Sequence, residues 1–194
     1  VNTDYTDTVG NTGGANSDTV VIGTLNPAVT VSIADASLND GDTSSNVTFQ
    51  FSEIVIGFDA SDVTVVGGSL TAFTALDENS FTATFTATEE VETTGSVSVG
   101  TGYTDTAGNQ GTAGSDNVVI DTLTPTVVVS IVDASLNDSD ASSEVTIQFS
   151  EDVADFDVAD VTPVGGMLSN FTTVDGNSYT ATFTANDGLE ATGS

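Results

Sequence analysis

The chain has 194 residues, of which 29 are Asp or Glu and none is Lys, Arg or His, so its formal charge is −29. Without a fixed cation, its side chains cannot form salt bridges or neutralise phosphates, which excludes nucleic acids and anionic membrane surfaces as partners. The absence of Cys and His also excludes disulfides, zinc sites built from these residues and nucleophile–histidine pairs. We therefore expect any cation to come from solution, and we do not expect an enzyme.

The composition nevertheless favours a folded protein. A hydrophobic share of 38%, together with 19 glycines, lies in the range of globular domains, so we expect a core despite the charge. No apolar run approaches the roughly 18 residues of a membrane helix, and Val1 does not begin a signal sequence. We expect no direct insertion into a membrane.

The sequence repeats itself with an offset of 98 residues. Thr24-Leu-Asn-Pro27 returns as Thr122-Leu-Thr-Pro125, and Asp35-Ala-Ser-Leu-Asn-Asp40 returns as Asp133-Ala-Ser-Leu-Asn-Asp138. The match runs without a gap from Val1/Val99 to Ser96/Ser194, with about two thirds of positions identical. A period of this length corresponds to one folded domain per repeat rather than to a solenoid or a propeller.

Pro27 and Pro125 mark the predicted linkers, because the residue before a proline is pushed towards an extended conformation. Residues 28–125 are then one complete repeat. Residues 1–27 correspond to the C-terminal strands of a preceding repeat plus its linker, and residues 126–194 correspond to a following repeat that lacks its last strands. The alternative is that the two ends complete each other between chains by strand addition, which would make a head-to-tail fibre.

Alternation of apolar and polar residues predicts the strands, beginning with Val29, Val31 and Ile33 on one face. Within one repeat, turns rich in Gly, Asn, Asp and Ser separate seven predicted strands, at residues 29–35, 47–53, 63–67, 70–76, 81–87, 96–103 and 117–121. Seven short strands in a repeat of 98 residues are typical of an immunoglobulin-like sandwich. We therefore predict an all-β fold of tandem Ig-like β-sandwiches, without the Cys-Trp-Cys signature of antibody domains.

Strands that alternate in direction place the acidic loops at two poles, the N-terminal pole where the chain enters a repeat and the C-terminal pole where it leaves. The predicted N-terminal pole holds Glu53, Asp59, Asp62, Asp77, Asp105, Asn109 and Asp116. The predicted C-terminal pole holds Asp35, Asn39, Asp40, Asp42, Glu89, Glu90, Glu92 and Asp121. In a tandem array, the acidic C-terminal pole of one repeat precedes the acidic N-terminal pole of the next.

This arrangement predicts calcium, because calcium takes six to eight oxygen ligands from carboxylates and carbonyls, whereas magnesium demands stricter geometry. Asp121 on the linker, with Glu151 and Asp160 after it, forms the best predicted set. The loop Tyr103-Thr-Asp105-Thr-Ala-Gly108-Asn109 is the expected further donor, with Gly108 and Asn109 suited to positive φ. The full set of predicted metal ligands is Asp7, Asn11, Glu53, Asp62, Asp105, Asn109, Asp121, Glu151 and Asp160.

Each acid taken alone also suits an ordinary turn, so the prediction depends on the set. The EF-hand pattern does not fit Asp35-Ala-Ser-Leu-Asn-Asp-Gly, because the Gly comes one position late and Asn46 stands where the bidentate Glu should be.

Four motifs in order carry a family resemblance: Thr104-Asp-Thr-Ala-Gly-Asn109, Asp121-Thr-Leu-Thr-Pro125, Phe149-Ser-Glu151 and Phe156-Asp-Val-Ala-Asp160. Over its whole length, the chain resembles the bacterial Ig-like extender repeats of giant RTX-type, type I-secreted adhesins, which include ice-binding and biofilm adhesins. The resemblance implies calcium-dependent β-sandwiches in long arrays, on the bacterial cell surface, that hold an adhesive domain away from the cell. It further implies calcium contacts from Asp121, Glu53, Glu151, Asp7 and Asp105.

The predicted function is a spacer that calcium stiffens at its junctions, with the neighbouring repeats as its partners and the adhesive target bound by other domains. One departure is Gly23, which stands where Asp121 stands in the other linker, so the first junction is expected to bind calcium more weakly or to bend more easily. A ligand-binding module for ice or glycans is the alternative, suggested by the outward row Thr82, Thr84 and Thr86. A hydrolase with paired carboxylates is the remaining class, and it would need a cleft.

Overall fold

A computed structural model describes residues 1–188 and 192–193, and they form two compact units, Val1–Leu123 and Thr124–Ser194. As predicted, the fold is all-β, with two short 3₁₀ helices as the helical elements of the described residues. Among the described residues, no helix is long or apolar enough to cross a membrane.

The first sheet of the complete repeat is antiparallel, and its strands are neighbours in the order β1, β3, β7, β6. The alternating sequence produces it directly, since every second residue of β3 is buried and the residues between are exposed. Hydroxyl and amide side chains cover the outer face and apolar ones the inner face. The strands are β1 (Val29–Ile33), β3 (Ser44–Phe51), β6 (Gly68–Ala75) and β7 (Ser80–Ala87).

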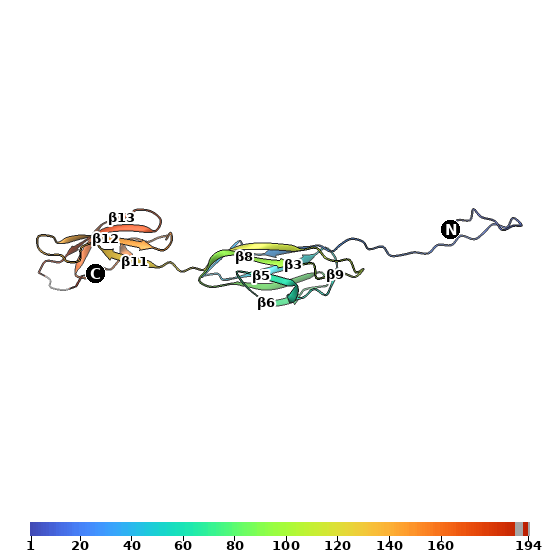
Figure 1. Cartoon of the computed structure of the whole chain (residues 1–194), viewed down its shortest axis with the longest axis horizontal. Coiled ribbons are helices and arrows are strands. Elements are labelled where there is room, and N and C mark those ends of the chain that lie inside the picture. Colours follow the sequence, from blue (N-terminus) through green and yellow to red (C-terminus); the bar gives the residue numbers. More distant parts are fainter. Residues whose placement is uncertain (189–191, 194) are drawn as a thin grey trace. The chain divides into compact units, whose positions relative to one another are not determined.

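The second sheet has the order β2, β10, β8, β5, and β2 runs parallel to β10 while the other pairs are antiparallel. A separate short pair, β4 with β9, joins two loops at one end of the sandwich (Figure 1). The bounds of these elements are β2 (Ser37–Asn39), β4 (Val55–Ile56), β5 (Val63–Val66), β8 (Glu92–Val99), β9 (Thr104–Asp105) and β10 (Gly114–Asp121).

The core of the repeat lies between the two sheets and is rich in aromatic rings at its N-terminal end. Phe58 packs edge-on against Phe51, Phe81 and Tyr103, with ring centroids 4.7, 5.0 and 6.0 Å away. Such tilted pairs are favoured over face-to-face stacking by the ring quadrupoles. Phe49 and Phe85 are fully buried beside them, as the alternation predicted.

The seven predicted strands of the repeat are all present, with shifted bounds. The strand predicted at 96–103 occupies Glu92–Val99, and the strand predicted at 117–121 begins earlier, at Gly114. Three short strands, β2, β4 and β9, were not predicted, because pairs of two or three residues depend on long-range partners rather than on local alternation. The helix η1 (Ala60–Asp62) was also missed, although Asp59 caps it by accepting from the backbone N of Ser61.

The second unit forms one antiparallel sheet from its described residues, in the order β11, β12, β14, β13. Its register repeats that of the first sheet, with Val129 opposite Ile147 where Val31 stands opposite Phe49. Val145, Ile147 and Phe183 lie at the centre of its core. The elements are β11 (Val127–Ile131), β12 (Ser142–Phe149), η2 (Val158–Asp160), β13 (Gly166–Thr173) and β14 (Ser178–Ala185).

Residues 1–16 keep one element of a repeat, the hairpin loop that corresponds to residues 99–114. Thr6 bridges Thr12, and the Tyr5 hydroxyl donates to the Gly14 carbonyl at 2.8 Å. After this loop, Val20, Val21 and Ile22 are 80%, 97% and 78% exposed.

Candidate metal sites at the poles of the repeat

The loops of the complete repeat gather at two poles, as the alternating strand directions predicted. At the N-terminal pole, the pairing of Val55 with Asp105 joins the loop after β3 to the loop after β8, which spans residues 100–113 and is called the F–G loop below. The loop between β6 and β7 lies there too, because Phe51 N donates to the Asn79 carbonyl at 2.9 Å. Figure 1 shows β9 at the end of the sandwich where the chain enters.

The C-terminal pole is formed by the loops after β1 and β7 and by the end of β10. Ala87 N donates to the Thr43 carbonyl, and Thr122 N donates to the Val91 carbonyl. Asp121 stands directly opposite Glu92 in the antiparallel register. Like charges opposite each other destabilise a strand pair, and this chain has no side-chain cation to relieve them.

Between the poles, the outer faces of the sheets carry few charges. The outward residues of β3 are Ser44, Asn46, Thr48 and Gln50, all exposed. Asp116 is an exception, and its predicted place at the N-terminal pole is wrong. It lies inside β10, and its Oδ2 accepts from Ile33 N at 2.9 Å, which ties the edge of the first sheet to the second sheet.

Glu53 and Glu151 are partly buried glutamates at equivalent positions of the two repeats. In each side chain, Oε1 is buried and has no hydrogen-bond partner. An unpaired carboxylate oxygen is costly to bury, because it loses its water and gains nothing in return. The same unpaired oxygen occurs at equivalent positions of both repeats, and a carboxylate oxygen of this kind can serve as a ligand for a cation.

The backbone around each glutamate is fixed by the neighbouring serine. Ser52 Oγ accepts from Ala28 N at 3.0 Å, and Ser150 Oγ accepts from Thr126 N at 2.9 Å. Each glutamate therefore lies beside the first residues of a repeat, where the linker ends.

Asp62 and Asp160 belong to the capping boxes of the two 3₁₀ helices. Oδ2 of Asp62 accepts from Asp59 N at 2.9 Å, and Oδ2 of Asp160 accepts from Asp157 N at the same distance. A Cβ placed on Gly102 would lie 2.7 Å from Asp62 Oδ1, so this oxygen faces the F–G loop. Asp62 therefore keeps one oxygen directed at the loop that the sequence predicted as a donor.

The F–G loop is organised by Asp105, which is 4% exposed. Its Oδ1 accepts from Ala107 N and Asn109 N, both at 2.8 Å, and its Oδ2 accepts from Asn109 Nδ2 at 2.7 Å. The hydrogen bond from the Asn109 side chain is the main cause that lowers the pKa of Asp105 below its usual value of 3.8. Asp105 thus uses three of its oxygen lone pairs to hold the turn. Only its remaining lone pairs could bind a metal.

The loop at residues 1–16 repeats this arrangement in an exposed setting. Asp7 accepts from Val9 N, Asn11 N and Asn11 Nδ2, and the Asn11 side chain is again the main cause that lowers the pKa of the aspartate. Gly108 has the predicted positive φ of 88°, and its counterpart Gly10 has a φ of 97°. Asn109 does not have a positive φ, so that prediction is wrong. Both the backbone and the side chain of Asn109 hold the turn through hydrogen bonds with Asp105.

The linker before the repeat is held by the F–G loop through contacts that sequence reasoning missed. The Tyr103 hydroxyl donates to the Thr112 carbonyl at 2.7 Å and lies 3.3 Å from the Pro27 carbonyl. Asn109 Nδ2 donates to the Gly23 carbonyl at 3.0 Å. The available signal was the spacing of Tyr103 and Gly111, repeated as Tyr5 and Gly13, since the tyrosine ring lies where a glycine Cβ would be.

The described residues contain no group of three acidic side chains close enough to hold a metal by themselves. A calcium site at either pole therefore requires backbone carbonyls, an amide oxygen or water in addition to carboxylates, and calcium commonly accepts all of these. The donor set is consistent with calcium, because every candidate is a hard oxygen and the orphaned Oε1 atoms of Glu53 and Glu151 lack another partner.

The threonine row lies on the outer face of the first sheet. Thr82, Thr84 and Thr86 are half-buried among the side chains of neighbouring strands, and Thr82 Oγ1 lies 2.9 Å from Asn46 Oδ1. The row is a hydrogen-bonded part of the sheet surface.

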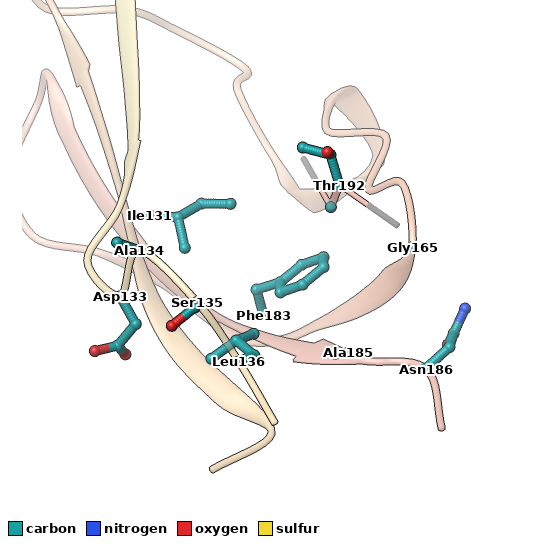
Figure 2. Close-up of a pocket in the computed structure, with 11 residues that line it drawn as sticks. Ile131, Asp133, Ala134, Ser135, Leu136, Gly165, Phe183, Ala185, Asn186 and Thr192 are labelled. Carbon is teal, nitrogen blue, oxygen red and sulfur yellow. The ribbon is translucent and has the colours of Figure 1, made fainter. Parts of the chain in front are cut away.

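The second unit contains a hollow of about 330 Å³ under Phe183, between Ile131 and Gly165 (Figure 2). In the complete repeat, the position equivalent to Gly165 is Gly67, and the side chain of Ile120 from β10 packs beside it, 3.0 Å from where a Cβ would be. The hollow thus corresponds to the place that a core side chain occupies in the complete repeat.

The comparisons with known proteins identify the class. The sequence model of the bacterial Ig-like domain family matches residues 23–120 and 121–194. The chain therefore belongs to the bacterial Ig-like domain family and carries it as two tandem repeats. No curated protein sequence matches the chain.

Three solved structures are similar at low identity and low TM-score. The crystal structure of invasin, a bacterial integrin-binding protein, shares 16% identity at a TM-score of 0.42, and the match covers 82% of this chain and 34% of invasin. The structure of the adhesin InvE of Yersinia pseudotuberculosis has 18% sequence identity and a TM-score of 0.34, and the match covers 82% of this chain and 51% of InvE. The structure of domains 4–9 of the surface layer protein SbsC has 16% identity and a TM-score of 0.25, and the match covers 85% of this chain and 28% of the SbsC chain.

Proposed function

We propose that the chain is a structural spacer from a large adhesin of the RTX type, outside the bacterial cell, and that calcium at the poles of its repeats stiffens the array. The Oε1 atoms of Glu53 and Glu151 carry this proposal, because one oxygen of each of these equivalent carboxylates is buried without a hydrogen-bond partner. At the N-terminal pole, Glu53 and Asp62 would hold the ion, with oxygens of the F–G loop as further donors. At the C-terminal pole, Asp121 beside Glu92 would take part.

The charge distribution supports the same proposal. The carboxylates of the repeat lie mainly in the loops at its two poles, and the chain has a formal net charge of −29 with no Lys or Arg. Bound calcium would offset the repulsion at each pole, and its loss would loosen the junction and lower the stability of the fold. Extracellular modules bind calcium with a Kd of roughly 0.1–1 mM, which suits an extracellular protein.

The test is thermal unfolding of the whole chain in chelator and in about 10 mM calcium, at constant ionic strength. With a Kd in the range above, the bound ion adds about 1.4–2.7 kcal/mol to the free energy of unfolding. Each 1 kcal/mol corresponds to a rise in Tm of about 4–8 °C for a domain of this size. An equal concentration of magnesium should produce a smaller rise.

Glu53→Gln keeps the shape of the side chain and removes its charge, so it should reduce the calcium-dependent rise in the Tm of the first unit. Glu78→Gln is the matched control, because Glu78 lies at the same pole with an exposed side chain. A Tm that is the same in calcium and in chelator would refute the proposed site. An equal loss in both variants would show that calcium acts by general screening.

A further inference from the structure

The linker between the repeats is held at its upstream end by a buried threonine. Thr122 follows β10 and is 1% exposed. Its hydroxyl donates to the Thr88 carbonyl at 2.8 Å and accepts from Val91 N at 3.2 Å, and its own N donates to the Val91 carbonyl at 2.9 Å. A hydroxyl buried in this way satisfies two backbone groups of the loop between β7 and β8 that would otherwise lack partners.

The downstream end of the same linker is held by the second unit. Thr126 N donates to Ser150 Oγ, and Ser150 N donates to the Thr126 carbonyl, each at 2.9 Å. Residues 123–125 are therefore all that lies between the two anchors. Pro125 has a fixed φ, and the residue before it is restricted to extended conformations. Thr122 and Thr126 are four residue steps apart, so their Cα atoms can be separated by at most about 14 Å.

We infer that Thr122 is a latch that makes the linker part of the folded upstream repeat, and that it limits bending at this junction independently of calcium. The polar character of Thr122 is what its site uses. Valine has the same shape but neither donates to the Thr88 carbonyl nor accepts from Val91 N. The first linker has the same residue, Thr24, but there it is exposed, so its hydroxyl has no comparable role in this chain.

The first measurement is amide hydrogen exchange of Val91 in the whole chain with chelator present. In Thr122→Val, the Val91 amide loses its acceptor, and its exchange should accelerate at least about tenfold, which corresponds to a loss of about 1.4 kcal/mol. Thr122→Ser keeps the hydroxyl and should keep the protection. Thr24→Val is the matched control and should leave Val91 unchanged.

The second measurement is the width of the distance distribution between two spin labels, at Ser115→Cys and Ser169→Cys. Both serines are exposed, one in each unit, and the chain has no cysteine of its own. In chelator, Thr122→Val should broaden the distribution, while Thr122→Ser and Thr24→Val should match the parent. A folded Thr122→Val chain with the parent's width would overturn the latch.

The calcium proposal and the Thr122 latch can be refuted independently of each other. A calcium effect that is absent from every variant would count against the metal sites and leave the latch standing. If Thr122 acts as the latch, Thr122→Val and Thr122→Ser differ in Val91 exchange and in the width of the distance distribution even when calcium has been removed by chelator. If Thr122→Val does not fold, exchange of the Thr122 amide in the parent chain decides. Exchange as fast as that of Thr24 would contradict the latch.

Discussion

At the scale of single residues, the aspartates of this chain act mainly by accepting hydrogen bonds from their own loops. Asp59, Asp77 and Asp175 each accept from a nearby serine, and that bond is the main cause that lowers the pKa of each carboxyl. Asp105 does the same through Asn109, in a more buried place. Ionised carboxylates are therefore built into the turns.

The lowered pKa of Asp105 predicts a pH dependence. A carboxyl whose pKa is lower in the folded than in the unfolded state stabilises the fold above its unfolded value, near 3.8. That contribution disappears as the pH falls through the lower folded value. Asp105→Asn should therefore lower the Tm at pH 7, and the difference from the parent should shrink below about pH 4.

Thermal unfolding between pH 7 and pH 2 measures this difference, with Glu78→Gln as the charge-matched control. A difference between Asp105→Asn and the parent that stays constant down to pH 2 would contradict the assignment of the effect to ionised Asp105.

At the scale of elements, the F–G loop is the part of the N-terminal pole that its own hydrogen bonds define most fully. It depends on the Tyr103 hydroxyl, which is buried, and burial raises the pKa of that phenol. Tyr103→Phe should leave the Thr112 carbonyl without its donor and cost about 1–2 kcal/mol, a fall in Tm of about 4–16 °C. Tyr5→Phe, in the exposed copy of the loop, should leave the Tm of the sandwich unchanged. If Tyr103→Phe also left the Tm unchanged, the Tyr103 hydroxyl would matter for the local loop only and not for the stability of the sandwich.

The sequence was informative wherever a local pattern decides the outcome. The alternation of apolar and polar residues around Phe49 and Phe85 predicted two core strands. Asp116 shows the limit, because its position in a turn-like stretch gave no sign that it bonds Ile33, 83 residues away. The burial of Thr122 and the orphaned oxygen of Glu53 also depend on chain segments that meet only after folding.

At the scale of the whole molecule, the charge of −29 predicts a strong response to simple salt. Raising NaCl from about 0.01 to 0.15 M shortens the Debye length from about 30 to about 8 Å, which screens repulsion between the acids. The Tm should rise by about 4–8 °C, corresponding to about 1 kcal/mol. Calcium should add its own increment at the higher salt concentration, and a Tm that does not respond to NaCl would show that the acids lie too far apart to repel.

The parallel pairing of β2 with β10 has a consequence for load. If the repeat is pulled at its two ends, tension enters through β1, which leads directly into β2, and leaves through the end of β10. The parallel strands β2 and β10 are then pulled in opposite directions along their length. The pairs Val119–Ser37, Ile120–Leu38 and Asp121–Asn39 are then sheared together instead of being unzipped one after another. Separating β2 from β10 would therefore require these pairs to break together, which is the loading that a spacer pulled at its ends would meet.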